Sequence, residues 1–155
     1  MDDWGRLDPG TPIRSRALLR DPARLLLLGS AVLITAGSIL PWVSGTSEFV
    51  GRISWNGMDG KGDGGVLSFL AILLAAYGLW GQRIVDSWAP VRYVPGLLMA
   101  MVVPVYVVAF RETARLISEG VGVGRLEIGL YVVGLGLVLG VPGAVLTYLE
   151  ARSPG

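Results

Sequence analysis

The chain has 155 residues, of which 52% are hydrophobic and only 16% are charged, and its 13 basic and 12 acidic residues leave a net charge of +1. A soluble domain usually has about a quarter of its residues charged, so this composition indicates a single domain in a membrane. The balance of charges gives no reason to expect a nucleic-acid partner.

The chain contains no cysteine and no histidine. Disulfides, thiolate nucleophiles, iron–sulfur clusters and thiolate zinc sites are therefore excluded. The commonest general base and metal ligand is missing as well, which excludes histidine-based triads and imidazole-bound haem. We therefore expect no catalytic residues, no cofactor and no enzymatic activity.

Four long stretches carry no charged residue, and they contain 23, 19, 18 and 22 residues (25–47, 64–82, 93–110 and 128–149). A helix needs about 20 apolar residues to cross the hydrocarbon core, and a charge at its centre is costly. The stretches predict an all-α membrane protein, a bundle of four transmembrane helices that forms one domain over 1–155. The predicted spans are about 23–43, 65–82, 90–110 and 128–149.

Local signals refine two of these helices. Asp21 followed by Pro22 is typical of a helix N-cap with proline at the first helical position. After the third span, oppositely charged residues recur three and four positions apart, which favours a helix that continues to residue 119 (Arg111, Glu112, Arg115 and Glu119). Gly120 is expected to end it.

Arginines predict the orientation, because cytoplasmic segments carry an excess of basic residues. The arm before the first span is the richest in arginine. We therefore predict a bacterial plasma-membrane protein with a cytoplasmic arm (1–22) and tail (150–155), and with exterior loops at 44–64 and 120–127. The basic residues assigned to topology and to contact with lipid head groups are Arg14, Arg16, Arg20 and Arg24.

The first exterior loop has apolar residues that can anchor it to the membrane surface (Phe49, Val50, Ile53 and Trp55). Asn56 followed by Gly57 is a tight-turn signal, so we expect a short β-hairpin there. The extension of the third helix is interpreted first as a solvated helix end. The functional alternative is an exterior docking surface formed by this extension and the hairpin.

The glycine-rich end of the same loop resembles a cation site only weakly. Asp59 and Asp63 match two positions of a calcium loop, but Lys61 and Leu70 occupy ligand positions of that loop. A flexible turn with Asp63 capping the second span is the favoured interpretation. An enzyme built on Asp59, Asp63, Glu48 and Arg52 ranks third among the functional hypotheses.

Small residues recur every four positions on three of the spans, a spacing that lets helices approach closely. The expected helix-packing residues are Gly136, Gly140 and Ala144, then Ala71 and Ala75, then Gly96 and Ala100. Packing within one chain is favoured over an interface between subunits. The spans themselves hold no carboxylate or basic side chain, so each hydroxyl in them is assigned to hydrogen bonds between helices.

Three segments carry a resemblance to a family. They are Gly29 to Pro41-Trp42-Val43, then Gly60-Lys-Gly-Asp-Gly-Gly65, then Gly129-Leu-Tyr131 before a glycine-rich last helix. In these the chain resembles the small four-helix membrane proteins of actinobacteria and related bacteria. The resemblance implies a tetraspan architecture in a bacterial plasma membrane and implies no activity.

Together these features predict a non-enzymatic accessory or scaffold subunit that presents its exterior loops to a partner, within a heteromeric complex. The alternative is a small transporter or pore subunit for an uncharged or apolar solute, assembled as a homo-oligomer along Gly136 and Gly140.

Overall fold

The computed structural model describes residues 21–47, 51–59, 63–85, 89–118 and 124–152. Its main elements are four helices, α2 (Pro22–Ile39), α3 (Asp63–Val85), α4 (Val94–Ser118) and α5 (Ile128–Arg152). A short 3-10 helix, η1 (Ala89–Tyr93), leads into α4. By length and composition all four α-helices could cross a membrane. The predicted four-helix architecture is therefore confirmed.

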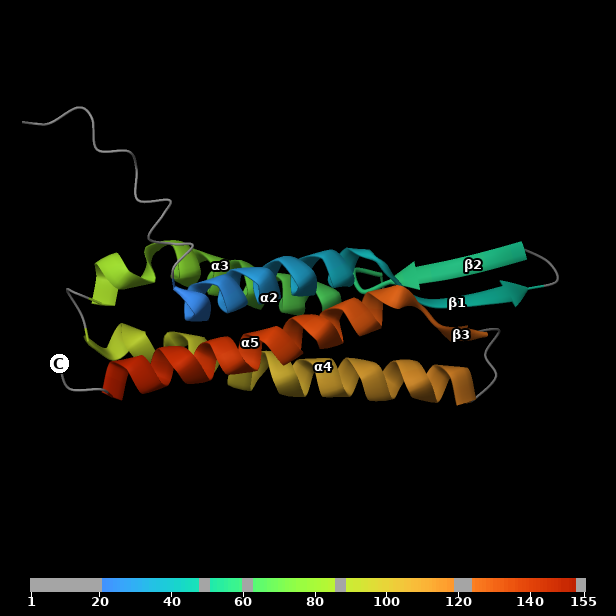
Figure 1. The fold of residues 1–155 in the computed structure, drawn as a ribbon. Helices are drawn as coiled ribbons and strands as arrows, with labels where there is room; N and C mark the ends of the chain where they lie inside the picture. Colours follow the sequence, from blue (N-terminus) through green and yellow to red (C-terminus); the bar gives the residue numbers. More distant parts are fainter. Residues whose placement is uncertain (1–20, 48–50, 60–62, 86–88, 119–123, 153–155) are drawn as a thin grey trace, which may run out of the picture.

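A small sheet stands at one end of the bundle (Figure 1). Its strands are β1 (Pro41–Ser47), β2 (Gly51–Asn56) and β3 (Arg125–Leu126), in the order β2-β1-β3 with both pairings antiparallel. The hairpin of β1 and β2 was expected, but β3, in the segment expected to be a loop, was not. At the opposite end of the bundle α2 begins and α5 ends.

The first helix begins where the sequence predicted and ends earlier. Asp21 caps α2, since its Oδ1 accepts a hydrogen bond of 3.2 Å from the backbone N–H of Arg24. The helix ends at Ile39 rather than near residue 43. Proline disfavours helical geometry in the residue before it, and Leu40, which precedes Pro41, is extended at φ −69° and ψ 157°. Residues 41–43 therefore belong to the sheet.

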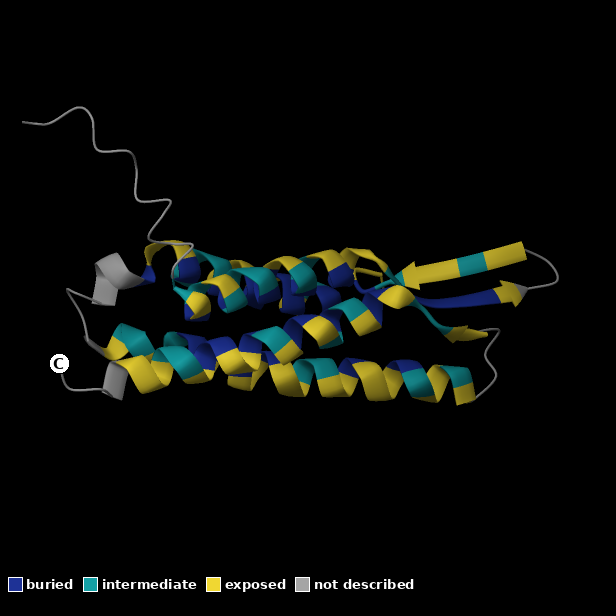
Figure 2. Ribbon diagram, viewed as in Figure 1, coloured by how far each residue is buried: buried dark blue, intermediate teal, exposed yellow. Residues whose placement is uncertain are grey.

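The four helices pack unequally. The contact between α2 and α5 is the most extensive, α2 also packs on α3, and α4 contacts α3 and α5. Of the four helices α4 is the least buried. Buried residues follow the inward sides of the helices, while exposed residues cover the outside of the bundle (Figure 2).

As its charge pattern predicted, α4 continues beyond the third uncharged stretch, to Ser118. Its last turns lie beside β3. Ala109 and Thr113 are both buried there, and the Thr113 hydroxyl donates a 2.7 Å hydrogen bond to the Ala109 carbonyl. The extension of α4 and the sheet thus occupy the same end of the molecule.

Candidate functional site

Trp42 attaches the sheet to the helical bundle. Its ring is buried, and its indole N–H donates a 2.8 Å hydrogen bond to the Gly37 carbonyl of α2. A Cβ placed on Gly57 or on Gly129 would lie within 3 Å of this ring, so only glycine fits at those two positions. Trp42 is therefore a fixed point between α2, α5 and the end of β2.

We call the three strands together the sheet platform. Partners across antiparallel strands lie on the same face, and successive residues alternate between faces. Ser44 faces Ser54 on β2 and Arg125 on β3. One face of the platform is therefore polar, and its members are Ser44, Thr46, Arg52, Ser54, Arg125 and Glu127.

Glu127 is the centre of this polar face. Its carboxylate accepts a hydrogen bond from the Ser44 hydroxyl, and its Oε1 lies 3.4 Å from Nη2 of Arg52 and 3.5 Å from Nε of Arg125. The Ser44 hydrogen bond lowers the pKa of Glu127 below its ordinary value, partial desolvation opposes this, and the two arginines lower it further. One carboxylate thus connects all three strands.

The opposite face of the platform is apolar. Val43 is buried, Leu126 and Ile53 are partly buried, and Trp55 is 41% exposed. Val43 belongs to the hydrophobic core together with Ala109 of α4, and Leu126 packs against that core. The face is therefore covered near the bundle and becomes accessible toward β2, where the Trp55 ring lies.

The predicted turn of the hairpin is misplaced. Asn56 is the last residue of β2, and its Oδ1 accepts hydrogen bonds from the backbone N–H groups of Met58 and Asp59. Asn56 and Gly57 therefore turn the chain away from the sheet toward α3. The connection between β1 and β2, with Phe49 and Val50, lies outside the described residues.

The two aspartates offered as cation ligands lie on either side of this turn. Asp59 Oδ2 accepts a 3.0 Å hydrogen bond from the backbone N–H of Asn56, and Asp63 is the first residue of α3. Within the described part of the chain no group of three or more acidic side chains is placed to hold a metal ion. Glu48 and Lys61 lie outside the described residues, and Arg52 contacts Glu127.

The small residues predicted for packing fall into two environments. A Cβ on Gly136 or Gly140 would lie within 3 Å of Ile34 or Ser30 of α2, so these glycines form the α2–α5 contact. Gly143, rather than Ala144, continues this contact against Ala23 and Leu27. Sequence spacing of four residues missed it, because the contacting residues are spaced alternately by four and three (Gly129, Val133, Gly136, Gly140 and Gly143).

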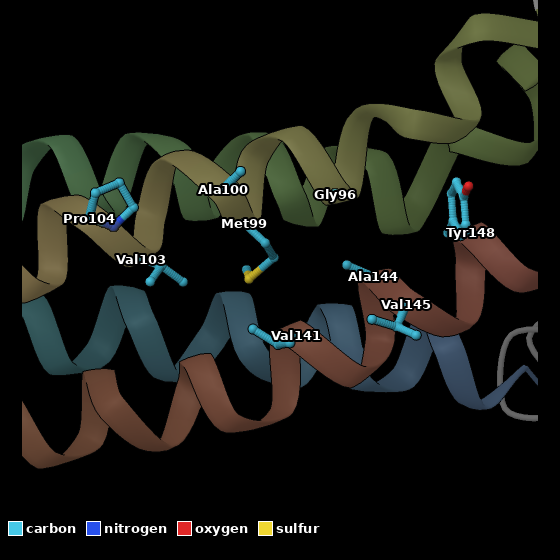
Figure 3. A pocket seen from close by; sticks show the side chains of 9 residues that line it. All are labelled: Gly96, Met99, Ala100, Val103, Pro104, Val141, Ala144, Val145 and Tyr148. Carbon is cyan, nitrogen blue, oxygen red and sulfur yellow. The ribbon is translucent and has the colours of Figure 1, made fainter.

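The remaining small residues line grooves between neighbouring helices, and two of them, Ala71 and Ala144, are also buried in the hydrophobic core. Gly96, Ala100 and Ala144 line a groove of about 460 Å³ between α4 and α5 (Figure 3). The other side chains of this groove are apolar or aromatic, namely Met99, Val103, Pro104, Val141, Val145 and Tyr148. We call it the α4–α5 groove.

A second groove, of about 340 Å³, lies between α2 and α3. Ala71 and Ala75 line it, opposite Ala31, Val32, Thr35, Ala36 and Ile39. We call it the α2–α3 groove. No charged or aromatic side chain is among its lining residues, all of which are described.

Of the arginines assigned to topology, only Arg24 is among the described residues. Its Nε lies 2.9 Å from Asp21 Oδ2, so it forms an ion pair at the first turn of α2. Arg14, Arg16 and Arg20 lie outside the described residues.

Comparison of the chain with protein-family models, with curated proteins and with solved structures finds no match.

Proposed function

We propose that this chain is an integral protein of a bacterial plasma membrane and acts as a non-enzymatic scaffold subunit. Its termini lie in the cytoplasm, and its sheet platform and the end of α4 bind a partner protein outside the cytoplasm. The observation that carries this proposal is the platform itself, because two loops distant in sequence are joined there into one surface beyond the apolar helices.

The outside of the bundle supports a membrane location. Helices of soluble bundles turn a polar face outward. Here each helix exposes large apolar side chains, and Val32 of α2 and Val138 of α5 are 67% and 66% exposed. The inward sides combine leucine and valine with alanine, serine and glycine, and such small residues let helices associate closely in lipid.

The composition of the platform supports a role in binding protein. Tryptophan and arginine contribute strongly to binding energy at protein interfaces. The platform exposes Trp55, and the side chains of Arg52 and Arg125 are 67% and 73% exposed. Its strands and the Trp42 anchor hold these groups in place before binding, which reduces the entropy lost on association.

The alternative of a homo-oligomeric pore has less support. Gly136 and Gly140, along which copies were expected to associate, are in contact with α2 of the same chain. Self-association along that stripe requires α2 to be displaced.

Orientation is tested with single cysteines, because the natural chain contains none to interfere. Thr46→Cys, on the platform, should react with a membrane-impermeant maleimide in intact cells. Glu150→Cys, at the far end of α5, should react only after lysis. Both positions are exposed, so reactivity reports location. The reverse labelling pattern would overturn the orientation, and release of the protein by alkaline carbonate would overturn the membrane location.

Partner binding is tested with a photo-crosslinking amino acid at Ser54, with Val32 as the lipid-facing control. Irradiation of cells should give a protein adduct from position 54 and none from position 32. Arg52→Ala, on the same face as Ser54, should reduce the yield of the adduct by about tenfold, because loss of an arginine anchor at a protein interface costs more than about 1 kcal/mol. Equal yields from both positions would contradict the proposal.

A further inference from the structure

The α4–α5 groove differs from the rest of the apolar surface at one of its ends. Tyr148 lines the groove, and its ring centroid lies 6.0 Å from that of Tyr93. The guanidinium carbon of Arg92 lies 5.6 Å from the centroid of the Tyr93 ring. A continuous path of contacts therefore leads from an apolar groove, through two aromatic rings, to a positive charge.

We propose that this groove is a binding site for an anionic phospholipid. One acyl chain lies against Met99, Ala100 and Val141, and the phosphate lies beside the guanidinium of Arg92. The inference rests on the membrane location proposed above and adds a ligand to it. It concerns the end of the bundle away from the sheet platform.

The shape of the groove suits an acyl chain. Gly96, Ala100 and Ala144 leave space between two helices, and Met99 points into that space as its floor (Figure 3). Its volume of about 460 Å³ lies within the usual range of ligand sites. The thioether of methionine is flexible and adapts to an irregular apolar ligand.

The charge at its end suits an anionic head group. Arginine binds phosphate by paired N–H donors, and tyrosine rings favour the boundary between lipid tails and head groups. Tyr148 lies at the end of the groove toward the point where α2 begins and α5 ends, which is the cytoplasmic end under our proposal. Anionic lipids at the cytoplasmic surface attract basic residues close to the membrane. The nearby acidic residue on α5 is Glu150, two residues beyond Tyr148. Residues so spaced point to different sides of a helix, so Glu150 and Tyr148 do not share one side of α5.

The experiment uses the full chain in nanodiscs of equal parts phosphatidylglycerol and phosphatidylcholine. The protein is then released into mild detergent, and the lipids that it retains are counted by native mass spectrometry. The wild-type chain should retain phosphatidylglycerol about five times more often than phosphatidylcholine, which is the preference that one basic residue near an anionic surface provides. Arg92→Gln should abolish this preference and Arg92→Lys should retain it.

The second part of the experiment fills the α4–α5 groove with a side chain. A Cβ on Gly96 would meet nothing within 4 Å, so Gly96→Leu is expected to fold while its side chain enters the groove. It should reduce retention of both lipids. The matched control is Ala36→Leu, an exposed position in the α2–α3 groove, which should change nothing.

Three outcomes would overturn the site. They are equal retention of the two lipids by the wild-type chain, an undiminished preference in Arg92→Gln, and unchanged retention in Gly96→Leu. If alkaline carbonate releases the protein from the membrane, the proposed membrane location is wrong, and the lipid site is wrong with it. If the protein stays in the membrane but shows no lipid preference, only the proposed lipid site in the α4–α5 groove is wrong.

Discussion

The two sides of α5 meet their neighbours in contrasting ways. Toward α2, Gly136 and Gly143 bring the two backbones close together, and this is the most extensive helix contact. Toward α4, Ala144 and the equally small Gly96 line an open groove. Small residues therefore permit close packing without causing it. What decides the outcome is whether the facing helix presents a complementary surface at the same spacing.

The largest expected effect is at the closed side. A Cβ on Gly37 would lie 2.7 Å from the Val133 backbone nitrogen and 2.8 Å from the Gly129 carbonyl oxygen. Backbone cannot move aside as a flexible side chain can, so Gly37→Leu should destabilise the chain by about 3 kcal/mol, measured by equilibrium unfolding in detergent. Gly96→Leu, at the open side, should change stability by less than about 0.5 kcal/mol. Equal losses of stability in the two variants would show that the α2–α5 and α4–α5 contacts do not differ in this way.

An intermediate effect is expected where α4 and α5 do touch. The Tyr106 hydroxyl donates a 3.2 Å hydrogen bond to the Leu130 carbonyl of α5. Tyr106→Phe should cost about 1 kcal/mol, the usual net value of such a bond, in the same unfolding measurement. Tyr131→Phe is the control, because Tyr131 is 60% exposed. A larger loss than in Gly37→Leu would show that the open side holds the bundle together.

The smallest effect concerns the residue before α5, Glu127, whose contacts with the sheet are polar and near the surface. Its pKa is lowered on folding, so the carboxylate contributes stability above its ordinary pKa of 4.5 and loses that contribution as the pH falls through the lowered value. The difference in thermal midpoint between the wild-type chain and Glu127→Gln should therefore narrow below pH 4.5. A difference that stays constant from pH 7 to pH 3 would contradict this assignment.

Much of the architecture was predictable from the placement of charge. The uncharged stretches located all four helices, Asp21 and Pro22 gave the start of α2, and alternating charges gave the extension of α4. These features follow from the cost of burying charge and from local hydrogen bonding. Both act over a few residues or along one helix, so one sequence is enough to read them.

Features that depend on contacts between distant segments were missed. The strand at Arg125 and Leu126 has no local signal, because two residues become a strand only when β1 lies beside them. The burial of Trp42 also has no local signal, because it depends on Gly57 and on Gly129, which is far away in sequence. Spacing by four gave Gly136 and Gly140 but not Gly143, which follows Gly140 by three residues and also lies against α2.

The close contact of α2 with α5 also affects the order of assembly. These are the first and last helices of the bundle, and β1 likewise pairs with a strand that immediately precedes α5. A chain is synthesised from its N-terminus, so the glycine and serine side of α2 has no partner until the final helix emerges. The bundle therefore closes in one late step, and a chain cut short before α5 would retain three helices and lose the contact that unites them.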